Sequence, residues 1–273
     1  MEESPLRLIT SNLEELRKVL INILKVFFVF FLLFFFFKEQ PFVIYGYSIP
    51  FIYPSPYFNM GDQLFGAIRY HLIHKEFTLI LINSTDGVVA DLYSCLFLTI
   101  ICSSPWITYQ LSKFIGPALK ANEKAALKQV LIPAILLFIF GAFIGLYYVA
   151  PDVFTILYYY DSGLGAQPTM SITSFVSFFL IYVLTFGMAF ETPIVMIGVT
   201  RAGLVPSDYW FKNWRYAVVG ALIFGVIFSP GMIGFTMMLL AIPIILLYFV
   251  GAYVSRKFEK KKDQDVIDVP SNQ

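Results

Sequence analysis

The sequence predicts an all-α membrane protein with six transmembrane helices. Hydrophobic residues make up 58% of the 273 residues, charged residues only 14%, and the mean hydropathy is +0.75. A soluble domain of this size would need a very large core to bury so much apolar surface. The apolar residues gather in six runs, most of them long enough to cross a ~30 Å hydrocarbon core as a helix. We therefore expect one transmembrane domain over residues 1–255 and a charged tail at 256–273.

The first run, residues 20–37, is rich in phenylalanine and follows a short amphipathic segment. Ser11 with Glu14, or Asn12 with Glu15, fits a helix N-cap with an acid at the third position. We expect a short helix at the bilayer surface before the first span. The segment 38–88 contains four prolines before residue 57 and predicts a long loop that does not span.

The other five runs predict the remaining spans. They lie at residues 88–111, 127–149, 173–199, 214–229 and 234–254. The fifth span is short, since roughly 16 residues reach only ~24 Å, so the bilayer must thin there or partner helices must cover it. Gly141 and Gly145 form a G-x-x-x-G pair that favours close helix packing, more readily within this chain than in a dimer. The tail is expected to be disordered.

The basic residues predict the orientation. Of the 19 Lys and Arg residues, 15 lie in the two tails and in the links that follow the second and fourth spans. Because basic residues accumulate on the cytoplasmic side, both termini are expected in the cytoplasm.

One acid lies within the fourth span. Glu191, in Phe190-Glu191-Thr192-Pro193, is the single acidic or basic residue of the run 175–199. A carboxylate there costs roughly 2.5 to 3.5 kcal/mol unless it faces protein or water, and such residues often mark a pathway or a binding site. Pro193 should kink the helix beside it. A protonated Glu191 that bonds a neighbouring helix is the alternative.

Motifs for soluble enzyme chemistry are absent. The chain has no nucleotide-binding glycine loop, no zinc-protease or serine-hydrolase motif and no paired-cysteine metal signature. His71 and His74 have no accompanying thiol or acid cluster, which argues against a metal site. We expect no enzyme activity, no cofactor and no metal.

The predicted cytoplasmic face carries few carboxylates near the membrane: Glu14, Glu15, Glu123 and Asp208. On a basic surface, such acids select a cationic ligand, and arginine suits them because its planar guanidinium meets a carboxylate through two parallel bonds. The alternative is that Glu15 pairs with Lys18, and Glu123 with Lys120, on solvated helix surfaces.

Several motifs recur in order along the chain. They are Leu13-Glu14-Glu15-Leu16-Arg17-Lys18, Ser104-Pro105 with Tyr109-Gln110, Phe114-Ile115-Gly116-Pro117-Ala118-Leu119 leading to Glu123, Phe190-Glu191-Thr192-Pro193, and Leu240-Ala241-Ile242-Pro243. Together with the predicted topology, they resemble the TatC family, the six-span core receptor of the twin-arginine protein translocase.

The resemblance implies a cup-shaped bundle in the cytoplasmic membrane that is not an enzyme. Such a receptor recognises the twin-arginine signal peptides of folded cargo. It assembles with single-span TatA and TatB type subunits, and with further copies of itself, for export driven by the proton-motive force. Its partners are protein and membrane lipid, not nucleic acid.

By motif, the resemblance also assigns a signal-peptide site. Glu15 and Glu123 would bind the arginine pair, and Glu191 beside Pro193 would face the concave side. The residues that would shape the site are Leu16, Arg17, Pro105, Gln110, Phe114, Pro117 and Leu119. The alternative function is a small proton-coupled secondary transporter that uses Glu191, although that class commonly shows internal repeats and we find none.

Overall fold

The structure is a computed structural model that describes residues 5–44, 47–55, 57–72, 78–115, 121–165, 167–201, 203–229 and 234–267. Within these ranges, only the backbone is described for residues 5–12, 42–44, 47–50, 115, 121–130 and 260–267.

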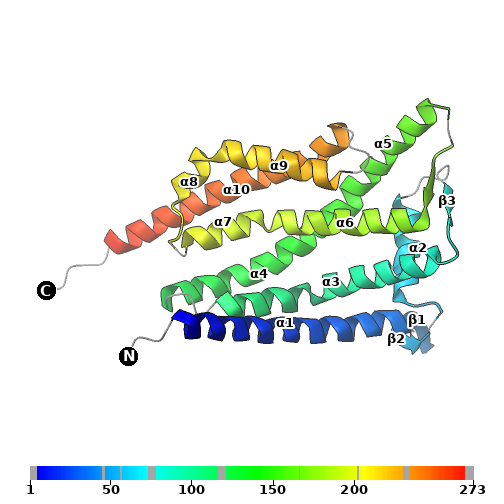
Figure 1. The fold of residues 1–273 in the computed structure, drawn as a ribbon, viewed down its shortest axis with the longest axis horizontal. Coiled ribbons are helices and arrows are strands. Elements are labelled where there is room, and N and C mark those ends of the chain that lie inside the picture. The colour runs from blue at the N-terminus through cyan, green and yellow to red at the C-terminus, as the bar shows by residue number, and fades with distance from the viewer. Residues whose placement is uncertain are drawn as a thin grey trace. The chain divides into compact units, whose positions relative to one another are not determined.

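The chain divides into two compact units. Unit 1 comprises Met1–Phe114 and Ala150–Leu180, and unit 2 comprises Ile115–Val149 and Ile181–Gln273. All three boundaries fall between consecutive helical residues, after Phe114, Val149 and Leu180 (Figure 1). The single domain expected for residues 1–255 remains a prediction.

Unit 1 contains two membrane helices, parts of two others, and a small capping structure formed by the strands and the short helix between residues 37 and 80 and by a strand at residues 169–171. Its elements are α1 (Pro5–Phe36), β1 (Phe37–Ile44), β2 (Tyr47–Pro54), α2 (Met60–Leu72), β3 (Thr78–Ile80), α3 (Asp86–Ile115), α5 (Ala150–Gly163), β4 (Thr169–Ser171) and the first part of α6 (Ile172–Phe190). β1 and β2 form an antiparallel hairpin in which Pro41 pairs with Pro50, and β3 pairs with β4 in parallel. The expected loop at 38–88 therefore contains a hairpin and a helix.

Aromatic side chains hold the core of unit 1 together. Phe175 of α6 lies with its ring 6.1 Å from that of Phe65 and 5.3 Å from that of Phe154. Phe97 of α3 and Phe179 of α6 are 5.2 Å apart. Because Phe65 comes from α2, this short helix covers α3 and α6 where they meet the capping structure.

The start of α1 differs from the sequence prediction. We expected a separate surface helix capped at Ser11 or Asn12, but one helix runs without a break from Pro5 through Phe36. No glycine or proline lies between residues 6 and 36, so nothing in the sequence stops helix propagation into the span.

Unit 2 contains the remaining membrane helices. Its elements are α4 (Ala121–Ile144), the π-helix η2 (Gly145–Val149), the last part of α6, α7 (Thr192–Arg201), α8 (Ser207–Lys212), α9 (Trp214–Phe228) and α10 (Gly234–Ile267). α10 packs against α7, α8 and α9, and α4 packs against α7.

The third membrane helix is longer than predicted. We expected it to end at residue 149, but it continues through η2 into α5, so its apolar stretch is Leu131–Gly163. Pro151 should break a regular helix because it cannot donate a backbone hydrogen bond. The π-turn directly before Pro151 changes the hydrogen-bond register at that point and lets the helix continue.

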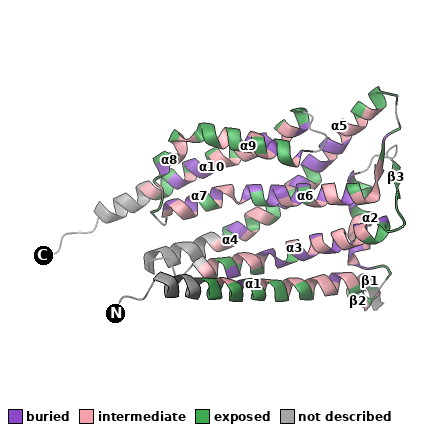
Figure 2. Cartoon of the chain, viewed as in Figure 1, coloured by how far each residue is buried: buried purple, intermediate pink, exposed green. Residues whose placement is uncertain are grey.

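The described residues confirm the six-span class. Five helices are long and apolar enough to cross a membrane, and α9 is the shorter sixth. Their exposure differs widely: 50% of the apolar window in α6 and α7 is buried, whereas only 6% of the α1 window is (Figure 2).

The C-terminal tail is helical over much of its length. We expected residues 256–273 to be disordered, but α10 continues to Ile267. The extension is tied to the rest of unit 2 because Glu259 Oε2 accepts a 2.8 Å hydrogen bond from the backbone N–H of Ser207, and Arg201 lies 4.0 Å over the ring of Phe258.

Candidate functional site

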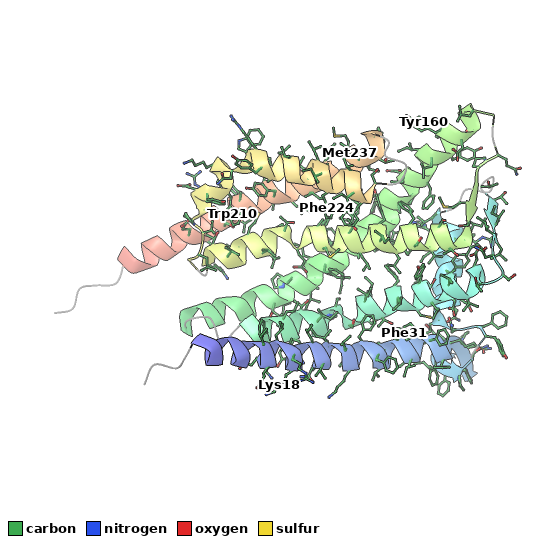
Figure 3. The ribbon with its side chains drawn as sticks, in the orientation of Figure 1. Lys18, Phe31, Tyr160, Trp210, Phe224 and Met237 are labelled. Atoms are coloured by element: carbon green, nitrogen blue, oxygen red, sulfur yellow. The ribbon has the colours of Figure 1, made fainter. Side chains whose placement is uncertain are left out.

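α1 carries three of the predicted site residues near the start of its membrane span. Glu15 and Arg17 are exposed, and Leu16 is half-buried. The predicted alternative, an ion pair between Glu15 and Lys18, is not formed, although the structure describes both side chains. In Figure 3, Lys18 extends from the side of α1 that faces away from α3. The Glu15 carboxylate therefore remains available to a ligand.

α3 carries Pro105, Gln110 and Phe114. Pro105 and Phe114 are half-buried, whereas Gln110 is only 5% exposed. Pro105 has no N–H to bond the carbonyl of Ile101, and the Ser104 hydroxyl donates to that carbonyl instead, at 2.8 Å. The Ser104-Pro105 pair thus keeps α3 continuous with its backbone satisfied.

Two polar contacts among the described residues define the register between α1 and α3. Trp106 Nε1 donates to the carbonyl of Asn22 at 3.3 Å, and Cys95 Sγ lies 3.7 Å from the carbonyl oxygen of Phe34. The two contacts are separated by roughly 17 Å of helix on both α1 and α3, so the helices run antiparallel in one register. Continuing that register toward the N-terminus brings Glu15 level with the end of α3 at Phe114.

Trp106 and Asn22 were missed by the sequence reading. Trp106 directly follows a proline within a predicted span, and this position could have singled it out. The acceptor of its hydrogen bond is a backbone carbonyl, which no pattern of residue types reveals.

The structure does not describe the side chains of three predicted site residues. Pro117 and Leu119 lie outside the described residues. Glu123 lies in the first turn of α4, in unit 2, and its side chain is not described. Its participation in the site remains a prediction.

Glu191 lies at a break between two helices. α6 ends at Phe190 and α7 begins at Thr192, as expected from Pro193. The Glu191 side chain is half-buried, and Pro193 is buried. A Cβ atom at Gly251 of α10 would lie only 2.8 Å from Pro193 Cα, so α10 packs closely against this break.

The glycine pair of the third membrane helix packs within the chain. A Cβ atom at Gly141 would lie 2.6 Å from Phe190 Cγ, and one at Gly145 would lie 2.9 Å from Phe186 Cβ. This confirms the prediction that the pair serves contacts within one chain.

Asp208, the remaining acid of the predicted face, has a cationic neighbour. Its Oδ1 lies 3.9 Å from Arg256 Nε, and both side chains are exposed. Such a pair contributes little to stability.

A protein-family model described as TatC, Sec-independent protein translocase protein, matches residues 11–243. The chain belongs to the TatC family. It is a subunit of the Sec-independent, twin-arginine translocase and a multi-pass membrane protein.

Full-length relatives support the TatC assignment. The Sec-independent protein translocase protein TatC of Cenarchaeum symbiosum (strain A) is 30% identical over 251 residues, which cover 92% of this chain and 95% of the relative. The TatC of Aquifex aeolicus (strain VF5) is 31% identical over 261 residues, covering 94% and 98%.

Solved TatC structures share the fold. A crystal structure of the twin arginine translocase receptor TatC matches with a TM-score of 0.71 and 28% identity, covering 90% of this chain and 98% of that one. A second structure of the receptor, in DDM, matches with a TM-score of 0.73 and 29% identity, covering 89% and 99%. Membership in a translocase family leaves the solute-transporter alternative without support.

Proposed function

We propose that this TatC protein is the receptor for twin-arginine signal peptides of folded cargo, and that Glu15 and Glu123 bind the arginine pair. The observation that carries the proposal is the placement of Glu15. Its exposed carboxylate lies on α1 level with Phe114 and has no ion-pair partner among the described residues. Arg17, Lys18 and Lys113 are exposed nearby in the sequence of the same two helices.

The surrounding charge makes the site selective. A peptide cation meets repulsion from the basic side chains and attraction only at the acids. Each arginine can form two parallel charge-assisted bonds with a carboxylate, each contributing about 1.5 to 3 kcal/mol, whereas lysine presents a single point charge. A signal peptide with two lysines in place of the arginines should therefore bind at least about tenfold more weakly.

The proposed receptor function also includes a role for Glu191, a membrane orientation and an energy source. The half-buried Glu191 would contact an inserted signal peptide or the helix of a single-span TatA or TatB type partner. The distribution of basic residues supports a cytoplasmic location for both termini, with the protein in the cytoplasmic membrane. Transport would draw on the proton-motive force and on assembly with further copies of the receptor.

Binding of a labelled twin-arginine peptide to protein in lipid nanodiscs tests the proposal. Glu15→Gln should weaken binding about 10- to 100-fold, because it removes one carboxylate from the bidentate contact. Glu123→Gln should do the same.

Glu14→Gln is the matched control. Glu14 is exposed and directly precedes Glu15, but the two side chains point about 100° apart around α1. Its substitution should leave binding within about twofold of wild type. Equal affinity of the wild type, Glu15→Gln and Glu123→Gln would refute the proposed site.

A further inference from the structure

Trp106 gives its indole hydrogen bond to another helix. It lies eight residues before Phe114, the end of the apolar stretch of α3, or about 12 Å along the helix from that end. Membrane tryptophans favour the headgroup region, where water can accept the indole hydrogen bond. Here the indole N–H donates to the backbone carbonyl of Asn22 on α1, at 3.3 Å. An indole N–H within an apolar stretch needs an acceptor from the protein, and this carbonyl supplies it where the two helices meet.

α1 has few other attachments. Only 6% of its apolar window is buried, compared with 39% for α3. In the described part of α1, Val19 and Phe34 are the buried side chains. The other polar contact between the described parts of α1 and α3 is that of the Cys95 thiol, a weak donor that lies 3.7 Å from the Phe34 carbonyl oxygen and nearer, at 3.6 Å, to Asp91 Oδ1. The Trp106 bond is therefore the stronger of the two and the closer to Glu15.

The hydrogen bond of Trp106 influences the position of Glu15 because Asn22 and Glu15 lie on the same rigid helix. Asn22 follows Glu15 by seven residues, or about two turns, so the two residues lie on the same face of the helix. On α3, Gln110 follows Trp106 by four residues and also shares its face. Sliding or rolling α1 against α3 would thus move the Glu15 carboxylate relative to Gln110 and Phe114.

We propose that Trp106 is a positioning residue for the signal-peptide site, which sets the register and rotation of α1 so that Glu15 meets an arginine in bidentate geometry. This role rests on the proposed function of Glu15. A lysine ammonium is a point charge and still binds a displaced carboxylate. The two parallel bonds between an arginine and a carboxylate need the carboxylate in one orientation. Loss of the bond should therefore reduce arginine-over-lysine discrimination more than it reduces folding.

Distances between spin labels at Glu14→Cys and Lys113→Cys, in a Cys102→Ser background, test the positioning without any ligand. Both sites are exposed and lie near the level of Glu15. Trp106→Phe keeps an aromatic ring but removes the donor, so it should broaden the distance distribution. Trp214→Phe, at the start of α9, is the matched aromatic control and should leave the distribution unchanged. An unchanged distribution in Trp106→Phe would overturn the proposal.

Peptide binding then tests the consequence. Trp106→Phe should lower the affinity for the twin-arginine peptide about 3- to 10-fold and narrow its margin over the twin-lysine peptide, with an unfolding temperature matching that of Trp214→Phe. A broadened distance distribution with wild-type affinity and discrimination would overturn the role in recognition. Wild-type protein that bound neither peptide would refute the proposed function itself, while the distances would still decide whether Trp106 holds α1.

Discussion

At the scale of single residues, Asn59 connects the capping structure to a membrane helix. It is 1% exposed, and its Nδ2 donates to Asp91 Oδ2 of α3 at 2.7 Å. Its Oδ1 accepts from the backbone N–H of Asp62 at 3.0 Å, while its own N–H donates to Asp62 Oδ2 at 3.4 Å. These reciprocal bonds form a capping box at the start of α2. Asn59 thus fixes both the start of α2 and its position on α3.

Gly61 is required for this close approach. A Cβ atom there would lie 2.5 Å from Cys95 Sγ and 2.6 Å from Asp91 Oδ1. We expect Gly61→Ala to destabilise the docking of α2 by about 1 to 3 kcal/mol, through overpacking. Hydrogen exchange of the α2 amides measures the loss.

Gly66, in the same helix, provides the control, since a Cβ atom there would meet nothing within 4 Å. Gly66→Ala should be neutral or stabilising by up to about 1 kcal/mol, because alanine favours the helix. Similar destabilisation by both substitutions would mean that α2 does not pack on α3 as described.

The stability of the Asn59, Asp62 and Asp91 cluster should depend on pH. Burial, and secondarily the charge of Asp91, raise the pKa of the Asp62 carboxyl, against the opposing effect of the Asn59 backbone hydrogen bond. Since the folded carboxyl holds its proton to higher pH than in the unfolded chain, its contribution to stability is greatest at low pH and is lost as the pH rises through the raised pKa.

Asp62→Asn, which cannot ionise, should flatten that dependence. Protection factors of the α2 amides, corrected for intrinsic exchange rates, should fall with rising pH in the wild type and less steeply in the variant. Parallel profiles for the two proteins would exclude Asp62 as the responsible group.

At the scale of elements, the contact of the third membrane helix with α6 depends on small residues. Gly141 approaches Phe190 more closely than Gly145 approaches Phe186. Gly141→Ala should therefore destabilise unit 2 by about 1 to 3 kcal/mol, and Gly145→Ala by less. Thermal unfolding in detergent provides the ranking.

Gly198 of α7, where a Cβ atom would meet nothing within 4 Å, is the comparison for this series. Gly198→Ala should not destabilise. If Gly141→Ala were as stable as Gly198→Ala, the α4 to α6 packing would need revision.

Hydropathy predicted the membrane helices well, because lipid requires long apolar helices whatever packs around them. It did not predict where helices continue beyond the membrane. The extension through Pro151 depends on the π-turn at Gly145–Val149, and the extension of α10 depends on the contact of Glu259 with Ser207. The capping box at Asn59 joins a loop to a distant helix, which local sequence patterns do not report.

At the scale of the whole molecule, the proposed function assigns the arginine pair to Glu15 and Glu123. Glu15 belongs to unit 1 and Glu123 to unit 2. The motif resemblance named both acids, but the sequence could not say what holds α1 in place, since Trp106 bonds a backbone carbonyl. The proposal requires one signal peptide to reach both acids.

The most direct measurement of this claim is crosslinking of Glu15→Cys to Glu123→Cys in a Cys102→Ser background, with a short bis-maleimide and a Glu15→Cys, Tyr253→Cys pair as control. We predict efficient crosslinking of the first pair alone, in native membranes. Failure of positions 15 and 123 to crosslink would contradict a shared arginine site.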